Sequence, residues 1–332
     1  MSSISGISRW SLAVQLSLLI VAGGALGAPR THAQTISFNA PFQLSDNEAN
    51  QGSPTVTYSS SLNYYWLYYV NHSNNIIYAD PTASGHPVST GIGVYSAELT
   101  NVGAAYLNNE ILISYVGSDQ QVHFATSQNG ESFGNIVTPS ASELGTGSAS
   151  PAIWCSPTLI SNGSTVYVAT VGTNGYVYIS STTDGQTFTP VRGNGVSVSS
   201  YQTVSQPALT IFNGSPWVAF TNGSSRYVVV GNATGTGATY VDNAVWGNSN
   251  RDGHYAGLAM VVVQGYLYIF GQDSASSQHL KEIYTSDGTN WSGVEFDEGI
   301  QLRWSPTVWT MAGYAYMVIQ DDGNTNLSVT SN

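Results

Sequence analysis

The chain has little charge and almost no cysteine. Only 8% of its 332 residues are Asp, Glu, Lys or Arg, and its single cysteine is Cys155. One cysteine cannot form an intrachain disulfide, so packing must stabilise the fold. A catalytic thiolate would need a neighbouring base to lower its pKa. We therefore expect Cys155 to be a buried apolar residue.

Basic residues are the scarcest of all, with 7 Lys and Arg against 19 Asp and Glu and a net charge of −12. A chain this acidic is repelled by nucleic acid phosphates and by anionic lipid. We therefore expect neither nucleic acid nor a membrane surface as a partner.

Long apolar runs are missing beyond residue 33. Before that point, Arg9 precedes an apolar run from Leu12 to Val21, and small residues continue to Ala33. This pattern is typical of a secretory signal peptide, and the run is too short to span a bilayer comfortably. We expect cleavage after Ala33, export to an extracellular or periplasmic space, and one domain over residues 34–332. An uncleaved anchor is the alternative.

Motifs for metals and cofactors are missing as well. No Gly-x-Gly-x-x-Gly lies between a strand and a helix, and no Ser-His-Asp set can be recognised. The histidines beyond residue 33, which are His72, His86, His123, His254 and His279, are scattered, with no two at ligand spacing. We expect no cofactor and no metal site, although the sequence leaves a structural calcium ion open.

What the sequence does contain is repetition. The segments "TSQNGESF", "STTDGQTF" and "YTSDGTNW" share one pattern, and their glycines are Gly130, Gly185 and Gly288. The separations are 55 and 103 residues, the second about twice the first, so the period is about fifty residues. A period of this length is typical of a propeller or an array of sheets.

Each repeat unit has the same order of elements. A short strand, often opened by Ser-Pro, is followed by a tight turn, an aromatic strand, a polar loop and a third strand. The shared motif and a fourth strand complete the unit, and no helical period is visible. Openings begin at Ser53, Ala97, Ser156, Gln206, Ala256 and Ser305.

The shared motif predicts a turn. Asp184 or Asp287 can accept N–H groups of its own turn, and the following glycine can adopt positive φ. The aromatic residue at the end can fill the gap between neighbouring sheets. We interpret the motif as a folding device without a catalytic role.

The last unit, from Ser305, lacks a fourth strand. The segment "ISFNAPFQL" from Ile36 resembles the fourth strands of other units and could pair with the last unit. Such pairing closes a ring and removes two exposed sheet edges. The sequence therefore predicts an all-β, closed six-bladed propeller of four-stranded blades, with a β-sandwich as the alternative.

The repeats resemble degenerate Asp-box (BNR) motifs, and the units resemble a sialidase-like propeller over residues 34–332. The motifs are one residue shorter between Asp and the aromatic than the usual pattern. The resemblance implies that Asp-boxes lie opposite the active site and that activity would need three arginines. The expected Arg-Ile-Pro is missing, and beyond residue 33 the arginines are Arg192, Arg226, Arg251 and Arg303. No catalytic residue carries over.

Another glycosidase would need two convergent carboxylates near the axis. The candidates in segments near first strands are Asp46, Glu48, Glu98, Glu143, Asp252 and Glu298. The sequence cannot pair them, and each is a solvated loop acid on the simpler interpretation.

Two segments before first strands combine aromatic, basic and polar residues, a composition that suits a sugar site. The candidate ligand-binding residues are Trp246, Arg251, Asp252, His254, Arg303 and Trp304, with Asp46 and Glu48 beside them. In the alternative interpretation, the two tryptophans only pack between blades.

The favoured function is recognition of carbohydrate, or of a polymer bearing it, without catalysis. A glycoside hydrolase or lyase on the same scaffold is the second hypothesis, and a protein-binding propeller is the third. The sequence does not determine the ligand or the oligomeric state.

Overall fold

The computed structural model divides the chain into two compact units, Met1–Gln34 and Thr35–Asn332. All residues that it describes belong to the second unit, which is treated alone below. The described residues are 42–43, 53–71, 75–81, 87–95, 101–235, 238–242, 246, 257–272, 280–295, 302, 305–320 and 327–331. Over these ranges, no helix has the length and hydropathy needed to cross a membrane.

The described residues form four-stranded antiparallel sheets, and five sheets use consecutive strands of the chain. Sheet 1 contains β2 (Thr55–Ser59), β3 (Tyr64–Asn71), β4 (Ile76–Pro81) and β5 (Val88–Gly93). Sheet 2 contains β6 (Gly103–Leu107), β7 (Glu110–Val116), β8 (Val122–Ser127) and β9 (Gly134–Val137). Sheet 3 contains β10 (Thr158–Ser161), β11 (Val166–Val171), β12 (Val177–Thr182) and β13 (Thr189–Pro190).

Sheet 4 contains β14 (Ala208–Phe212), β15 (Ser215–Thr221), β16 (Val228–Asn232) and β17 (Thr239–Asp242). Sheet 5 contains β18 (Ala259–Val263), β19 (Tyr266–Gln272), β20 (Leu280–Thr285) and β21 (Ser292–Glu295). Sheet 6 is different, because its strands come from both ends of the unit. They are β22 (Thr307–Met311), β23 (Tyr314–Gln320), β24 (Leu327–Ser331) and β1 (Phe42–Gln43).

The strand β1 pairs antiparallel with β24, with Phe42 opposite Val329 and Gln43 opposite Ser328. These two residues belong to the N-terminal segment that the sequence predicts as a partner for the last unit. The rest of that segment, residues 36–41 and 44, lies outside the described residues.

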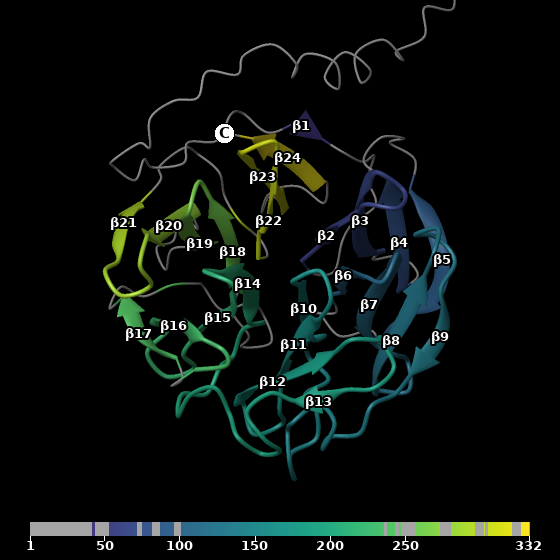
Figure 1. The fold of residues 1–332 in the computed structure, drawn as a ribbon, viewed down its shortest axis with the longest axis horizontal. Coiled ribbons are helices and arrows are strands. Elements are labelled where there is room, and N and C mark those ends of the chain that lie inside the picture. Colours follow the sequence, from purple (N-terminus) through teal and green to yellow (C-terminus); the bar gives the residue numbers. More distant parts are fainter. Residues whose placement is uncertain are drawn as a thin grey trace, which may run out of the picture. The chain divides into compact units, whose positions relative to one another are not determined.

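The first strands of the sheets lie next to one another in chain order, from β2 through β6, β10, β14 and β18 to β22, and β22 also contacts β2. Figure 1 shows these strands at the inner ends of their sheets and β5, β9, β13, β17 and β21 at the outer ends. The prediction of an all-β fold of four-stranded antiparallel sheets is confirmed.

The tight turns after the first strands follow from their residue types. A two-residue type I′ hairpin needs positive φ at both central positions, which Asn and Gly tolerate best. Both positions have positive φ at 108–109, 213–214, 264–265 and 312–313. The predicted turn at 162–163 is different, because only Gly163 has positive φ and four residues separate β10 from β11.

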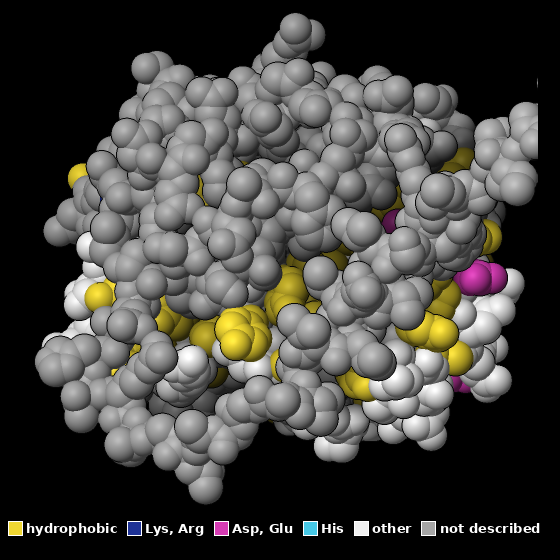
Figure 2. Space-filling view, turned by 90° about the horizontal axis from the view of Figure 1, so that it is seen from above, with side chains coloured by type: hydrophobic (Ala, Val, Ile, Leu, Met, Phe, Trp, Pro, Cys, Tyr) yellow, Lys and Arg dark blue, Asp and Glu magenta, His cyan; other side chains and the backbone are white. Residues whose placement is uncertain are grey.

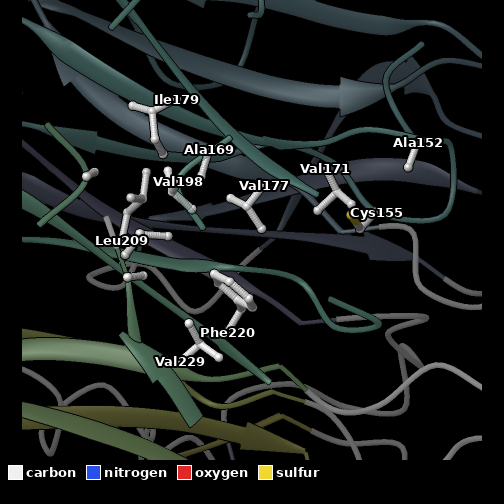
Figure 3. Close-up of a cluster of buried hydrophobic side chains, with 13 residues drawn as sticks. Ala152, Cys155, Ala169, Val171, Val177, Ile179, Val198, Leu209, Phe220 and Val229 are labelled. Carbon is white, nitrogen blue, oxygen red and sulfur yellow. The ribbon is translucent and has the colours of Figure 1, made fainter. Parts of the chain in front are cut away.

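The hydrophobic core lies in layers between neighbouring sheets. One cluster joins sheets 3 and 4, and Figure 3 shows Cys155 in it beside Ala152 and Val171. Cys155 is only 4% exposed, and burial raises the pKa of its thiol. The prediction that Cys155 is a buried apolar residue is confirmed.

The surface carries few basic groups. Among the described residues, the cations of Lys and Arg are Arg192, Arg226 and Lys281, and Lys281 is buried. Figure 2 shows hydrophobic side chains and a few acidic ones, and no described Lys or Arg, on the side seen there. Acidic groups such as Asp119 and Asp184 are exposed, so the charged groups on the described surface are mainly acidic.

Candidate functional site

A cavity of about 590 Å³ lies between the first strands of all six sheets. Its lining mixes hydroxyl and small apolar side chains. Representative residues are Thr57, Ala105, Leu159, Ala208, Met260 and Thr307. Among the described residues that line it, none is Asp, Glu, Lys, Arg or His. The described part of the cavity wall can therefore offer hydroxyls, carbonyls and apolar contacts.

The repeated Ser-Pro-Thr openings connect neighbouring sheets around this cavity. The Thr158 hydroxyl donates a hydrogen bond of 2.6 Å to the carbonyl oxygen of Pro207 in the next sheet. The Thr307 hydroxyl of sheet 6 donates in the same way to the carbonyl oxygen of Pro54, which precedes sheet 1. The openings therefore have a structural role that the sequence analysis did not identify.

The cavity has two ends, which we name from the first strands. At the entry end, where first strands begin, the Ser156 N–H donates to Asn101 Oδ1 at 2.8 Å and links two neighbouring sheets. At the hairpin end, where first strands finish, the aromatic rings of Tyr58, Tyr65 and Trp309 line the cavity.

In the sequence, most of the predicted ligand-binding residues fall in segments that precede first strands. Asp46, Glu48, Arg251, Asp252, His254, Arg303 and Trp304 all lie outside the described residues. The hypothesis that they meet in one site therefore stays a prediction.

Trp246 is the one member of that set within the described residues, and it is a core residue. Its side chain is 0% exposed and packs in the cluster between sheets 4 and 5. The Nζ atom of Lys281 lies 5.0 Å from the centroid of its ring. Because no ring face is free to stack on a ligand, we remove Trp246 from the candidate site and assign it the packing role.

Glu143 is the only one of the candidate carboxylates among the described residues. It accepts hydrogen bonds of 2.7 Å from the Ser140 hydroxyl and from the Ser140 N–H. These two bonds lower its pKa, and it does not line the cavity. Glu143 therefore stabilises its own turn, while Glu98 and Glu298 lie outside the described residues.

One polar network at the surface was missed by the sequence analysis. His123 Nε2 lies 2.8 Å from Asp119 Oδ1, and His123 Nδ1 lies 2.8 Å from the hydroxyl of Thr138. The hydrogen bond from His123 lowers the pKa of Asp119. None of the three lines the cavity, and Asp119 also accepts the Gln121 N–H, so we interpret the network as a link between β8 and its neighbouring loops. The four-residue spacing of Asp119 and His123 was the available signal.

The three repeated motifs form turns with the same hydrogen bonds. Asp184 Oδ1 accepts the N–H groups of Gln186 and Thr187, both at 2.8 Å. Asp287 Oδ1 accepts the N–H groups two and three residues further on at the same distances, and Asn129 does so in sheet 2 at 3.1 and 2.9 Å. The predicted turn geometry is confirmed, including positive φ at all three glycines.

These turns also connect neighbouring sheets. A Cβ atom on Gly130 would overlap the ring of Trp66 in sheet 1, and one on Gly288 would overlap the ring of Trp217 in sheet 4. The Tyr68 hydroxyl adds a hydrogen bond of 2.9 Å to the Gly130 carbonyl. Each glycine is therefore needed both for its φ and for close approach to the preceding sheet.

Two substitutions at Asp184 distinguish the hydrogen bonds that its side chain accepts from the charge that it carries. Asp184→Asn should keep the turn, because Asn129 makes the same hydrogen bonds in sheet 2, whereas Asp184→Ala should lower the free energy of unfolding by about 1 kcal/mol. The N–H groups of Thr187 and Gln186 lower the pKa of Asp184. Its charged form therefore stabilises the fold above the unfolded pKa of about 4, and this contribution disappears as the pH falls through the lower folded value.

Urea unfolding at pH 7 and pH 3 tests this expectation. The Asp184→Asn protein should lose less stability between these two pH values than the wild type, by a small amount because the carboxylate is exposed. Equal stability of the wild type and the Asp184→Ala protein at pH 7 would contradict the structural role.

Comparison with known proteins gives similarity in structure only. No protein-family model matches the sequence, and no curated protein matches it. The structure is similar to that of Trypanosoma rangeli sialidase, with a TM-score of 0.57 and 13% identity over 88% of this chain and 58% of that chain. The fold is a β-propeller. This chain corresponds to little more than half of that sialidase.

Two other solved structures are similar over most of both chains. One is Aleuria aurantia lectin in complex with alpha-methyl-L-fucoside, with a TM-score of 0.54 and 11% identity over 84% of this chain and 90% of the lectin. The other is a subtype N11 neuraminidase-like protein of a flat-faced bat influenza virus. Its TM-score is 0.52, with 12% identity over 90% of this chain and 94% of that protein. At these identities the similarity concerns the propeller fold alone.

Proposed function

We propose that this protein is an exported, carbohydrate-recognising six-bladed propeller that binds its ligand at the entry end of the axial cavity. The observation that carries the proposal is the cavity itself, which six first strands line with hydroxyls and apolar groups and without charge. Sugar sites combine such hydrogen-bonding groups with apolar contact. The Arg- and Trp-containing segments that precede β18 and β22 would supply specificity.

Ring closure by the N-terminal strand is part of this proposal. It is supported by the pairing of β1 with β24 and by the bond from the Thr307 hydroxyl to the Pro54 carbonyl. The Tyr65 hydroxyl of sheet 1 also donates to the carbonyl oxygen of Thr310 in sheet 6 at 3.2 Å. In this arrangement β1 covers the outer edge of β24 in sheet 6.

Two further elements of the proposal rest on the sequence. We infer that residues 1–33 are a signal peptide and that residues 34–332 form one exported domain. We also infer that the three repeated turns are degenerate Asp-boxes, an interpretation that their shared hydrogen bonds and their lack of cavity contacts support.

Recognition without catalysis is favoured over sialidase chemistry. Beyond residue 33 the sequence has four arginines, and neither Arg192 nor Arg226 lines the cavity. The Arg192 guanidinium instead donates to the carbonyl oxygen of Gly235 at 2.5 Å. Only Arg251 and Arg303 are left for a ligand at the axis, too few for the three-arginine site that the sialidase resemblance implies.

A glycan array combined with a panel of chromogenic glycosides tests the proposal. We expect binding to a subset of glycans and no hydrolysis of the glycosides. Hydrolysis would favour a glycoside hydrolase that uses two of the candidate carboxylates Asp46, Glu48, Glu98, Asp252 and Glu298. A lack of binding to all glycans would contradict carbohydrate recognition.

The two remaining arginines make the proposal specific. Arg251→Ala and Arg303→Ala should each weaken binding of the array-selected glycan by roughly 10- to 150-fold, because a charge-assisted hydrogen bond to a ligand is worth about 1.5–3 kcal/mol. Isothermal titration calorimetry measures this change, with Arg192→Ala as the matched control. Equal affinities in all three variants would remove the arginines from the site.

A further inference from the structure

The hairpin end of the propeller carries an ordered set of tyrosines. Tyr64, Tyr266 and Tyr314 are the first residues of β3, β19 and β23, and each is paired with the last residue of its own first strand. They therefore occupy one equivalent position in sheets 1, 5 and 6. We call these three residues the tyrosine row.

The row covers three neighbouring sheets and then stops. The strand β22 of sheet 6 contacts both β18 of sheet 5 and β2 of sheet 1, so the order along the surface is Tyr266, Tyr314, Tyr64. The equivalent residues in sheets 2, 3 and 4 are Glu110, Val166 and Ser215. The aromatic row is thus confined to half of the repeats.

The tyrosines of the row reach solvent. Tyr314 is 51% exposed and Tyr64 is 46% exposed, and with Tyr58, at 41%, they make up three of the six exposed large hydrophobic side chains among the described residues. Tyr266 is half-buried against the cluster between sheets 5 and 6. The exposed aromatic surface is therefore concentrated at the hairpin ends of adjacent sheets.

Other aromatic rings pack against one another at the junction of sheets 1 and 6, beside the row. The ring centroids of Tyr58 and Tyr65 lie 4.8 Å apart, and those of Tyr65 and Trp309 lie 6.4 Å apart across the junction of sheets 1 and 6. The Trp309 ring in turn stacks on Tyr316 at 5.5 Å. Tyr64 directly precedes Tyr65, and Tyr314 lies two residues before Tyr316, so both belong to strands whose neighbouring rings pack together.

The chemistry of the surface selects an uncharged ligand. The hairpins beside the row have the sequences "SSLN", "QG" and "AG", without a charged residue. The exposed faces of tyrosine rings suit the C–H faces of sugar rings, while phenol and serine hydroxyls suit sugar hydroxyls. A row repeated from sheet to sheet matches a ligand that is itself a repeating chain.

We propose that the tyrosine row is a second binding surface, separate from the entry end of the cavity, which holds an extended, neutral polysaccharide by stacking of successive sugar rings. The proposal does not depend on the entry-end site. It makes the protein a binder of polymeric carbohydrate through the hairpin end of sheets 5, 6 and 1.

Affinity electrophoresis in native gels tests the row. The gels contain hydroxyethylcellulose, laminarin, xylan or galactomannan, and the wild type should be retarded by at least one of them. The double variant Tyr64→Ala, Tyr314→Ala should raise the dissociation constant by roughly tenfold, since two ring contacts are lost. The double variant with phenylalanine at both positions should keep most of the affinity, because it keeps the rings.

Ile136→Ala, which alters a 58% exposed side chain on β9, is the matched control and should behave as the wild type. If the double alanine variant does not fold, the single variant Tyr314→Ala is measured in its place. Arg251→Ala and Arg303→Ala should leave retardation unchanged, which separates this surface from the entry-end site.

Three results would overturn the proposal. The first is a wild type that none of the four polymers retards, and the second is a tyrosine-to-alanine variant retarded as strongly as the wild type. The third is a wild-type dimer in light scattering that the alanine variant converts to a monomer while no polymer is bound, which would make the row a self-association surface.

Discussion

Replacing Gly288 by alanine is expected to lower the free energy of unfolding by about 2–5 kcal/mol. Gly288 has φ of 79°, where an L-residue with a Cβ costs about 1–2 kcal/mol. The new Cβ would also overlap the ring of Trp217, and such overpacking costs about 1–3 kcal/mol more. Gly130→Ala should have a similar effect, because its Cβ would overlap Trp66.

Alanine substitutions at two other glycines distinguish the cost of backbone strain at positive φ from the cost of steric overlap of the new Cβ. Gly313 has φ of 86° with nothing within 4 Å of an added Cβ, so Gly313→Ala should cost only the backbone strain. At Gly185 the Cβ would lie 3.3 Å from flexible atoms of Leu112 and Thr126, so an intermediate loss is expected. Urea unfolding of the four variants measures the series. Equal losses at Gly288 and Gly313 would show that the turn does not pack tightly on the preceding sheet.

A chain that begins at residue 44 is expected to be much less stable than one that begins at residue 36. The shorter chain lacks β1, so the outer edge of β24 loses its partner and exposes unpaired backbone groups. Each lost ladder hydrogen bond is worth about 0.5–1.5 kcal/mol, and the open edge can pair with another chain. We expect a lower unfolding midpoint and a larger aggregated fraction.

Thermal unfolding and size-exclusion chromatography of the two chains test this expectation. The chain that begins at residue 36 is the control, because it lacks the same leader but keeps β1. If both chains have the same midpoint and the same monomer fraction, the N-terminal strand does not close the ring.

The repeated turns were predictable from sequence because every contact that defines them is local. The side chain of Asp184 bonds to N–H groups two and three residues away, and Gly185 has positive φ within the same turn. The hairpins at 213–214 and 264–265 are predictable for the same reason. Short-range chemistry of this kind needs no knowledge of the neighbouring sheets.

The candidate site was less predictable, because it depends on packing between units. The segment around Trp246 has a composition that suits a sugar site, yet the indole is fully buried between sheets 4 and 5. The sequence cannot distinguish a tryptophan that stacks on a ligand from one that stacks on its own core, since both need a large apolar side chain. His123 likewise acquires its contact with Thr138 only when β8 pairs with β9.

By itself the sequence determined the repeat, the strand order within each unit, the turn chemistry and the buried state of Cys155, because local propensity and hydrophobic patterning decide these. The tertiary structure alone decided which side chains share a surface. It placed the uncharged first strands around one cavity and brought Tyr266, Tyr314 and Tyr64 into one row on adjacent sheets. These residues are distant in the chain, and only the contacts between sheets 5, 6 and 1 bring them together.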